Sequence, residues 1–243
     1  MMSRVKRYVK YAPSIAAAGT LALAPLVAAA AATPSPAPSL DQVLAAPPSG
    51  FVEVTTGGLN GQFDAHGWAT SVTSGSDASQ TEATLTRDGF VDGYGKTWSQ
   101  AAAGRGLVEG VMAFNGGEGA RKALMAFEAS TKADPHYKHS DQLSGIDPYY
   151  GAHVVDSSTN VIADESFFVK GNDLFFVAIA SQADDVLSLT VSQAKLSTTR
   201  PLQPQSPLRT GRRIMVIRLY PILAQRPRTF SSLYWFSESL ALW

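Results

Sequence analysis

The sequence of 243 residues contains no cysteine. This absence excludes disulfide bonds, thiolate zinc sites, iron–sulfur clusters and a thiol nucleophile. It also excludes a lipid anchor attached through a cysteine side chain. A folded domain of this chain must therefore be stable through its hydrophobic core alone. The 159 residues from Leu40 to Thr198 are enough to form such a core.

The sequence also lacks the common catalytic and nucleotide-binding motifs. It contains no Gly-x-Ser-x-Gly, no His-Glu-x-x-His, no Walker loop, no Gly-x-Gly-x-x-Gly after a strand and no Asp-x-Asp-x-Asp-Gly calcium loop. We therefore expect a non-enzymatic protein without a cofactor. A hydrolase with a triad assembled from distant segments is the alternative, with His66 or His153 as its base, because triads are recognised by geometry.

Charge is divided unevenly along the chain, although the 20 basic and 20 acidic side chains balance. Residues 1–32 carry four basic and no acidic groups, whereas residues 33–198 carry nine basic and 19 acidic groups. Residues 199–243 carry seven arginines and one acid, Glu238. The central segment, with a net charge of −10, repels phosphate backbones, so we expect no nucleic-acid partner.

The N-terminus has the pattern of an export signal. Four Lys and Arg residues within residues 4–10 precede an uncharged run of 18 residues, Ile15 to Ala32, which is rich in Ala and Leu. Small residues close the run, and a Pro-rich stretch follows at residues 33–38. This order is typical of a secretory signal peptide. We expect cleavage after one of Ala30 to Ala32 and a secreted or extracytoplasmic product.

Four segments follow from these patterns. We assign residues 1–32 to a signal peptide or short membrane anchor, 33–49 to a Pro/Ala/Ser-rich linker and 50–198 to one globular domain. Residues 199–243 form an Arg- and Pro-rich tail that we expect to be disordered. If the N-terminal run were retained, the protein would be a membrane-anchored envelope sensor, which is a second alternative.

Residue periodicity predicts an α+β domain. Alternation with period 2 predicts an antiparallel hairpin from residues 89–98 and 105–114, and Gly171-Asn172 predicts a tight turn in a second hairpin. Helical spacing predicts helices at residues 77–87, 118–130 and 183–196, the last with Val186, Leu189 and Leu196 facing the core. Further strands are predicted at 51–55, 152–156, 161–170 and 173–181. We expect a single antiparallel sheet of five to six strands covered by helices.

Two segments carry a resemblance to a known fold family. The order helix, hairpin, helix, meander and terminal helix, with residues 87–98 (RDGFVDGYGKTW) and 168–177 (FVKGNDLFFV), resembles small extracytoplasmic α+β domains of high-GC bacteria. Those domains are similar in outline to the PsbP-like sandwich fold. The resemblance covers residues 50–198 and implies a binding or sensing accessory domain.

One polar loop has residues that suit a metal ion. Asp134, His136 and His139 lie within six residues, and imidazole and carboxylate groups are ligands for zinc or copper. The alternative is ordinary turn chemistry, because Asp-Pro and Ser-Asp are common in turns and Lys138 adds an unfavourable charge.

A row of aromatic residues is the candidate for ligand binding. Period-2 alternation places Phe90, Tyr94 and Trp98 on one face of a predicted strand. They either pack in the core or line a cavity for an apolar ligand, together with Tyr149, Tyr150, Phe167 and Phe175.

Glu109 is the carboxylate that we expect near the core. It lies in the second strand of the predicted hairpin between Leu107 and Val111. A buried carboxylate needs a partner, and Arg105 or Lys96 across the hairpin could supply it.

Taken together, the sequence favours an exported, non-enzymatic domain that binds an envelope protein or a small apolar ligand. Contact with the membrane is expected only through the N-terminal segment, if that segment is not cleaved.

Overall fold

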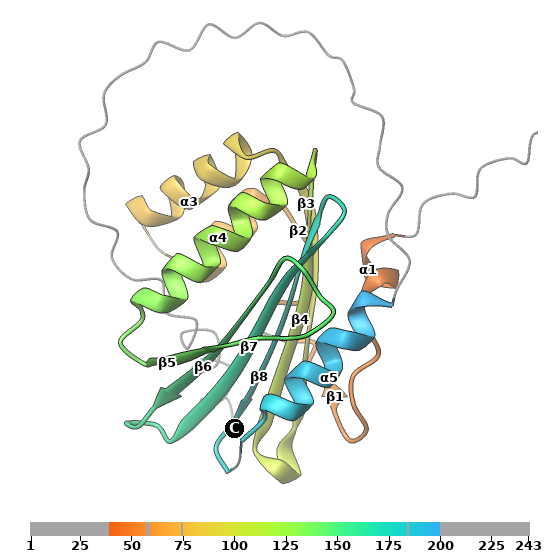
Figure 1. Cartoon of the computed structure of the whole chain (residues 1–243), viewed down its shortest axis with the longest axis vertical. Helices are drawn as coiled ribbons and strands as arrows, with labels where there is room; N and C mark the ends of the chain where they lie inside the picture. Colours follow the sequence, from red (N-terminus) through yellow and green to blue (C-terminus); the bar gives the residue numbers. More distant parts are fainter. Residues whose placement is uncertain (1–38, 57–58, 74, 184, 200–243) are drawn as a thin grey trace, which may run out of the picture. The chain divides into compact units, whose positions relative to one another are not determined.

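The computed structural model describes residues 39–56, 59–73, 75–183 and 185–199. The predicted signal peptide, the linker up to residue 38 and the tail from residue 200 lie outside the described residues. The described residues form one α+β domain, as predicted, with an eight-stranded antiparallel sheet (Figure 1). The strands are β1 (Val52–Glu53), β2 (Gly61–Phe63), β3 (Phe90–Gln100), β4 (Arg105–Phe114), β5 (Tyr137–Asp141), β6 (Tyr149–Asp156), β7 (Val161–Lys170) and β8 (Asp173–Ser181).

The sheet combines a hairpin with a four-strand meander. Its order is β1-β3-β4-β8-β7-β6-β5, and the short β2 pairs with β3 as well. The chain leaves the β3–β4 hairpin, crosses to the far edge at β5 and returns strand by strand, so that β8 pairs with β4. Both hairpins that the sequence predicts are present, and in each the two strands are joined by a turn that contains glycine.

The two faces of the sheet carry separate hydrophobic clusters. Neighbouring residues of a strand point to opposite faces, and Phe167 and Phe168 of β7 accordingly belong to different clusters. Helices α2 (Ala65–Val72), α3 (Ser76–Arg87) and α4 (Gly117–Ala133) contribute to the first cluster, and Figure 1 shows α3 beside α4. We call the side of the sheet under these three helices the first face.

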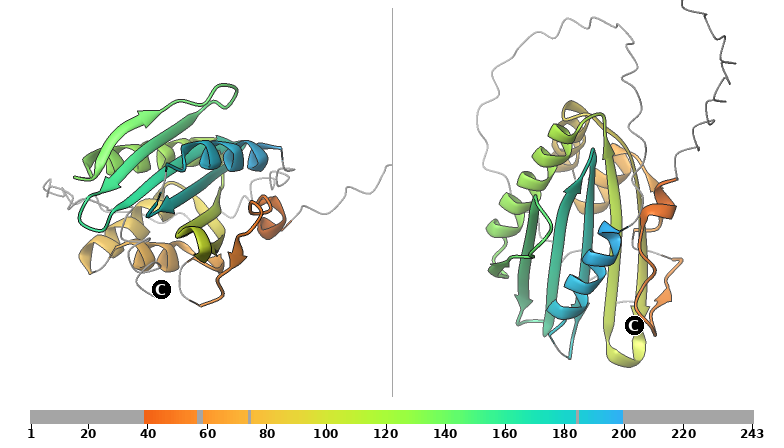
Figure 2. Two further views of the ribbon diagram at one scale, coloured as in Figure 1. Left: turned by 90° about the horizontal axis from the view of Figure 1, so that it is seen from below. Right: turned by 45° about the vertical axis from the view of Figure 1, so that its right-hand side comes forward.

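Helices α1 (Leu40–Val43) and α5 (Leu187–Thr198) cover the second face. Val43 is fully buried there, beside Leu107 of β4 and Ala194 of α5. Figure 2 shows α5 lying along the sheet with α1 near its C-terminal end. Residues 43–45, which we assign to the linker from their sequence, are therefore packed against the sheet.

Some elements were not visible in the sequence. Helix α2 and strands β2 and β5 have no clear periodicity, and β5 lies in a segment that reads as a polar loop. The strand predicted at residues 51–55 is reduced to the two residues of β1. These short strands at the edges raise the number of strands to eight without changing the fold class.

Within the described residues, no helix has the length and hydropathy needed to cross a membrane.

Candidate ligand-binding site

A cavity of about 410 Å³ lies between helices α2 and α3 on one side and α4 on the other. This volume is within the usual range for small-molecule pockets, about 300–1,000 Å³. Its apolar wall contains Trp68, Leu85, Ala123, Ala126, Phe127 and Ala129. The cavity therefore offers a mainly apolar surface between helices, away from the interior of the sheet.

Short side chains create this space. Ala123, Ala126, Ala129 and Ala133 recur along α4, and all four line the cavity. On the opposite wall, Thr81 and Thr84 of α3 face them. Because Ala and Thr side chains are small, the two helices flank an open volume at this point instead of filling it.

Trp68 fixes the floor of the cavity. It is 4% exposed, and its indole makes edge contacts with Phe127 and Phe176, at centroid distances of 5.7 and 5.3 Å. Phe63 packs against the same indole at 5.4 Å. A side chain held by three rings keeps one orientation, so this wall is preorganised for a ligand.

Polar side chains surround the apolar wall. Thr73, Asp77, Gln80, Thr81, Thr84 and Asp88 come from α3 and the segments next to it, and Ser130 comes from α4. Asp88 is already engaged by Arg87, whose Nε lies 3.2 Å from the carboxylate. Asp77 accepts a long hydrogen bond from Ser76, at 3.4 Å. A few polar groups around an apolar pocket are the usual means of orienting a ligand.

The aromatic row proposed from the sequence is divided between the two faces of the sheet. Tyr94, Trp98 and Tyr149 belong to the second face, whereas Phe90 and Tyr150 belong to the first. The reason is an irregularity at Val91: the pairing with β4 shifts between Phe90 and Asp92, so one extra residue reverses the direction of Phe90. None of these five residues lines the cavity between the helices.

Tyr149 has a hydrogen-bonding partner beside it. The Tyr149 hydroxyl lies 2.9 Å from Ser166 Oγ. Burial raises the pKa of Tyr149, and burial also raises the pKa of Tyr150. Phe167 and Phe175, the other two residues of the proposed set, lie on opposite faces as well. Ligand binding by this set stays a prediction, and the geometry assigns its members to packing on two separate faces.

The proposed metal ligands do not form one group. Asp134 accepts a hydrogen bond from the backbone N–H of His136 at 2.8 Å, which is turn chemistry, and His136 lies 3.8 Å from Asp156. His139 belongs to β5 and stacks on His153 instead. Across residues 39–199, apart from the undescribed positions, no set of three or more His, Cys, Asp or Glu side chains is placed to hold a metal ion.

Each candidate catalytic histidine has a carboxylate partner. His66 Nδ1 lies 2.9 Å from Glu82, and His153 Nδ1 lies 2.7 Å from Asp164, which is fully buried. The contact with Glu82 raises the pKa of His66, first through the hydrogen bond and then through charge. In the described part of the chain, no serine hydroxyl bonds either histidine. Among the described residues, each histidine thus has the carboxylate partner of a triad but is bonded to no serine.

Glu109 is fully buried, as expected, but its partners differ from the predicted ones. Its carboxylate accepts hydrogen bonds from the Ala45 N–H at 2.8 Å, Gln193 Nε2 at 2.8 Å and Ser197 Oγ at 2.6 Å. Lys96 lies opposite Glu109 in the hairpin, yet its Nζ bonds Glu53 at 3.1 Å. Glu109 therefore ties α5 and the segment after α1 to the centre of the sheet.

Sequence reasoning missed the residues of the cavity. Ala120, Ala123, Leu124 and Phe127 share one apolar side of α4 at helical spacing, and these residues belong to the first cluster. The neighbouring alanines were not singled out. A row of Ala on one helix facing Thr on another is the signal that could have indicated open space.

The comparisons with known proteins give no family. No protein-family model matches the sequence, and no curated protein is found as a relative. A solved structure similar to this chain is the extracellular domain of PknH from Mycobacterium tuberculosis, with a TM-score of 0.42 and 12% identity. The alignment covers 66% of this chain and 93% of that chain. A TM-score below 0.5 supports no conclusion about function, and the resemblance to PsbP-like domains stays an expectation, so we argue from this chain's own residues.

Proposed function

We propose that this protein is an exported, non-enzymatic α+β domain that binds a small apolar ligand in the cavity between α2, α3 and α4. The observation that carries the proposal is the cavity itself, with a volume of about 410 Å³ and a wall formed by Trp68, Leu85 and Phe127. It replaces the aromatic row of β3 as the binding site expected from the sequence.

The energetic reason is the apolar wall. Water in contact with Trp68, Phe127 and the alanines of α4 is released when a ligand covers them, at a gain of about 25 cal/mol per Å² of apolar surface. The rings of the wall are already held in place by Phe63 and Phe176, so little ordering is required on binding.

The polar residues around the cavity define the chemistry of the ligand further. Asp77 places negative charge at the cavity, where Asp88 is paired with Arg87, while Thr81 and Gln80 supply neutral hydrogen-bonding groups. An anionic ligand is disfavoured by this charge. The site fits a neutral or cationic molecule with an apolar body and one or two hydroxyl, amide or amine groups.

Export is the second part of the proposal, and it rests on the N-terminal sequence. The basic residues before the run Ile15 to Ala32, and the small residues at its end, are those of a secretory signal. Intact-mass spectrometry of protein from culture medium and from membranes tests this part. A soluble product that begins near Thr33 supports export with cleavage, whereas membrane-bound protein that retains its first residues supports the anchored sensor.

The binding part is tested with 1-naphthylphenylamine, a neutral apolar probe whose fluorescence rises when it leaves water. The test variant is Ala126→Phe, because Ala126 lines the cavity and a phenyl ring there occupies it. The matched control is Met125→Phe, the neighbouring residue on α4, which is 58% exposed and does not line the cavity.

We expect saturable binding to the wild-type protein and to Met125→Phe, and at least tenfold weaker binding to Ala126→Phe. Circular dichroism of each variant establishes that the fold is retained. Equal binding to all three proteins, or no binding to the wild type, would show that the cavity is not the binding site.

A further inference from the structure

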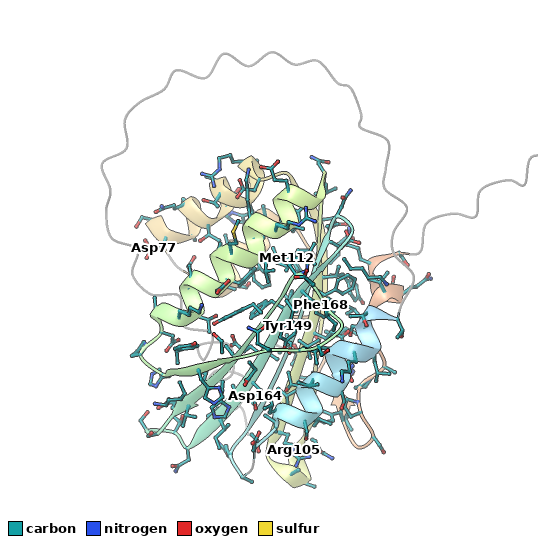
Figure 3. All side chains as sticks on the ribbon, in the orientation of Figure 1. Asp77, Arg105, Met112, Tyr149, Asp164 and Phe168 are labelled. Atoms are coloured by element: carbon teal, nitrogen blue, oxygen red, sulfur yellow. The ribbon has the colours of Figure 1, made fainter. Side chains whose placement is uncertain are left out.

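Three strands bring two histidines and a buried aspartate into one row. In the register of the sheet, His139 of β5 lies opposite His153 of β6, and His153 lies opposite Asp164 of β7. Residues directly opposite each other in neighbouring strands point to the same face. The three side chains therefore lie side by side, although 25 residues separate the first from the last. Figure 3 shows Asp164 well apart from Asp77 at the helix cavity, so the two sites are separate.

The two imidazole rings are stacked and nearly parallel. Their centroids are 4.8 Å apart and their planes differ by 9°. His153 Nδ1 lies 2.7 Å from Asp164 Oδ1, and His139 Nδ1 lies 3.3 Å from Asp141 Oδ1. Of the two tautomers of a neutral imidazole, a carboxylate at Nδ1 favours the one that carries its proton on Nδ1. In that tautomer the Nε2 lone pair of each ring is free to bind a cation.

The surroundings of the two rings are electronegative. One oxygen of Asp164 and one of Asp141 are buried and have no hydrogen-bond partner. In the described part of the chain, neither Asp141 nor Asp164 forms an ion pair with Lys or Arg, and each lies beside a histidine ring instead. A cation bound by the rings would offset this charge.

We propose that the Nε2 atoms of His139 and His153 bind a divalent transition-metal ion, with Asp141 and Asp164 orienting the rings. Imidazole nitrogens select Cu²⁺, Ni²⁺ and Zn²⁺ over Mg²⁺ and Ca²⁺, and the Irving–Williams order makes Cu²⁺ the tightest. A nitrogen–metal distance of about 2.0–2.1 Å requires the two nitrogens to lie within about 4 Å of each other. Because the lone pairs of two nearly parallel rings do not converge, the His139 ring must rotate out of the stack to direct its Nε2 at the shared ion. The His139 side chain is 57% exposed and has the freedom to rotate.

The protein supplies two ligands, and water completes the coordination. This agrees with the absence of any set of three ligating side chains among the described residues. Binding is consequently weaker than at a closed structural zinc site, and the ion can exchange. This site uses His139 but neither Asp134 nor His136, which the sequence alone had suggested.

The test is a titration of the untagged protein with ZnCl₂ and with NiCl₂, followed by the histidine ring signals in NMR spectra and by calorimetry. The test variants are His139→Gln and His153→Gln. His66→Gln and His136→Gln are matched controls, because they are the other two histidines of the chain and each has a carboxylate nearby. MgCl₂ serves as the control for a hard cation.

We expect Zn²⁺ and Ni²⁺ to shift the ring signals of His139 and His153 first, and Mg²⁺ to leave them unchanged. His139→Gln, at an exposed position, retains the fold and lowers the affinity at least tenfold, and His153→Gln does the same if circular dichroism shows it folded. His66→Gln and His136→Gln change the affinity less than twofold. Unchanged binding by His139→Gln, a larger loss in either control, or no binding at 1 mM metal would overturn the proposal.

Discussion

The indole of Trp68 meets the ring of Phe127 edge to face, with 5.7 Å between their centroids, and both rings line the cavity between α3 and α4. Trp68 comes from α2 and Phe127 from α4, so this contact joins the two sides of the cavity. The same pair takes part in the core of the first face. The candidate binding site is thus supported by the packing that stabilises the domain.

Removal of the Trp68 side chain is expected to affect both stability and binding. Trp68→Ala deletes a side chain that is 4% exposed and contacts three rings, which costs about 3–5 kcal/mol in the free energy of unfolding. Urea denaturation measures this loss. Met125→Ala, at an exposed position of α4, serves as control and changes the stability by less than about 0.5 kcal/mol. Equal stability of the two variants would contradict the packing role of Trp68.

The buried Glu109 carboxylate is expected to contribute more to the stability of the fold than an exposed carboxylate does. Glu109→Gln replaces one acceptor oxygen by an NH₂ donor, which then faces Ser197, Gln193 or the Ala45 N–H, and we expect a loss of about 2–3 kcal/mol. Glu53→Gln removes the carboxylate of a partly exposed ion pair with Lys96 and costs at most about 1 kcal/mol. Chemical denaturation at pH 7 compares the stabilities of the two variants with that of the wild type. A Glu109→Gln protein as stable as wild type would show that the carboxylate is dispensable.

Asp173 is expected to make stability depend on pH. Burial raises the pKa of Asp173 from 3.8 to about 6, and Lys170 counteracts this only in part. The folded state therefore binds its proton more tightly than the unfolded state, so this group lowers stability as the pH rises from about 4 to about 6. Asp173→Asn should match wild type near pH 3.5 and exceed it at pH 7 by up to about 3 kcal/mol, at 1.36 kcal/mol per pKa unit.

Thermal or urea unfolding of both proteins at several pH values measures this difference. A stability difference between Asp173→Asn and wild type that is constant over this pH range would contradict the raised pKa of Asp173.

Gly110 of β4 allows an aromatic ring to lie directly on the backbone. A Cβ atom at this position would lie 2.2 Å from Phe176 Cζ, which requires the ring to move. Gly110→Ala is therefore expected to destabilise the fold by about 1–3 kcal/mol. At Gly116, the residue before α4, a Cβ meets no atom within 4 Å, so Gly116→Ala is expected to cost less than about 1 kcal/mol. Differential scanning calorimetry compares the stabilities of the two variants. A larger loss of stability in Gly116→Ala than in Gly110→Ala would contradict the close contact at Gly110.

The hairpins and most helices could be predicted because local signals determine them. The two segments on either side of the turn Gly171-Asn172 predict β7 and β8 with the bounds that the structure has. The single extra residue at Val91 leaves no mark in composition, so the direction of Phe90 was predicted incorrectly. A bulge depends on the pairing of two strands, which a sequence pattern does not contain.

Helix α5 shows a second limit of hydrophobic patterns. Leu196 was expected to face the core, yet it is 53% exposed, while Gln193 and Ser197 are buried. Gln193 and Ser197 face the sheet because they donate hydrogen bonds to the buried Glu109 carboxylate. Glu109 lies 84 positions before Gln193 in the sequence. The cavity was unpredictable for a similar reason, since space between two helices depends on how they pack.

The most direct test of the ligand cavity is a two-dimensional NMR titration of the isotope-labelled protein with 1-naphthylphenylamine. We predict that the indole N–H signal of Trp68 and the amide signals of Thr84, Ala126 and Ala129 shift first and saturate together, while signals near Trp98 and Tyr149 on the opposite face remain in place. Shifts confined to Tyr94, Trp98 and Tyr149, or no shifts at saturating probe, would contradict the account.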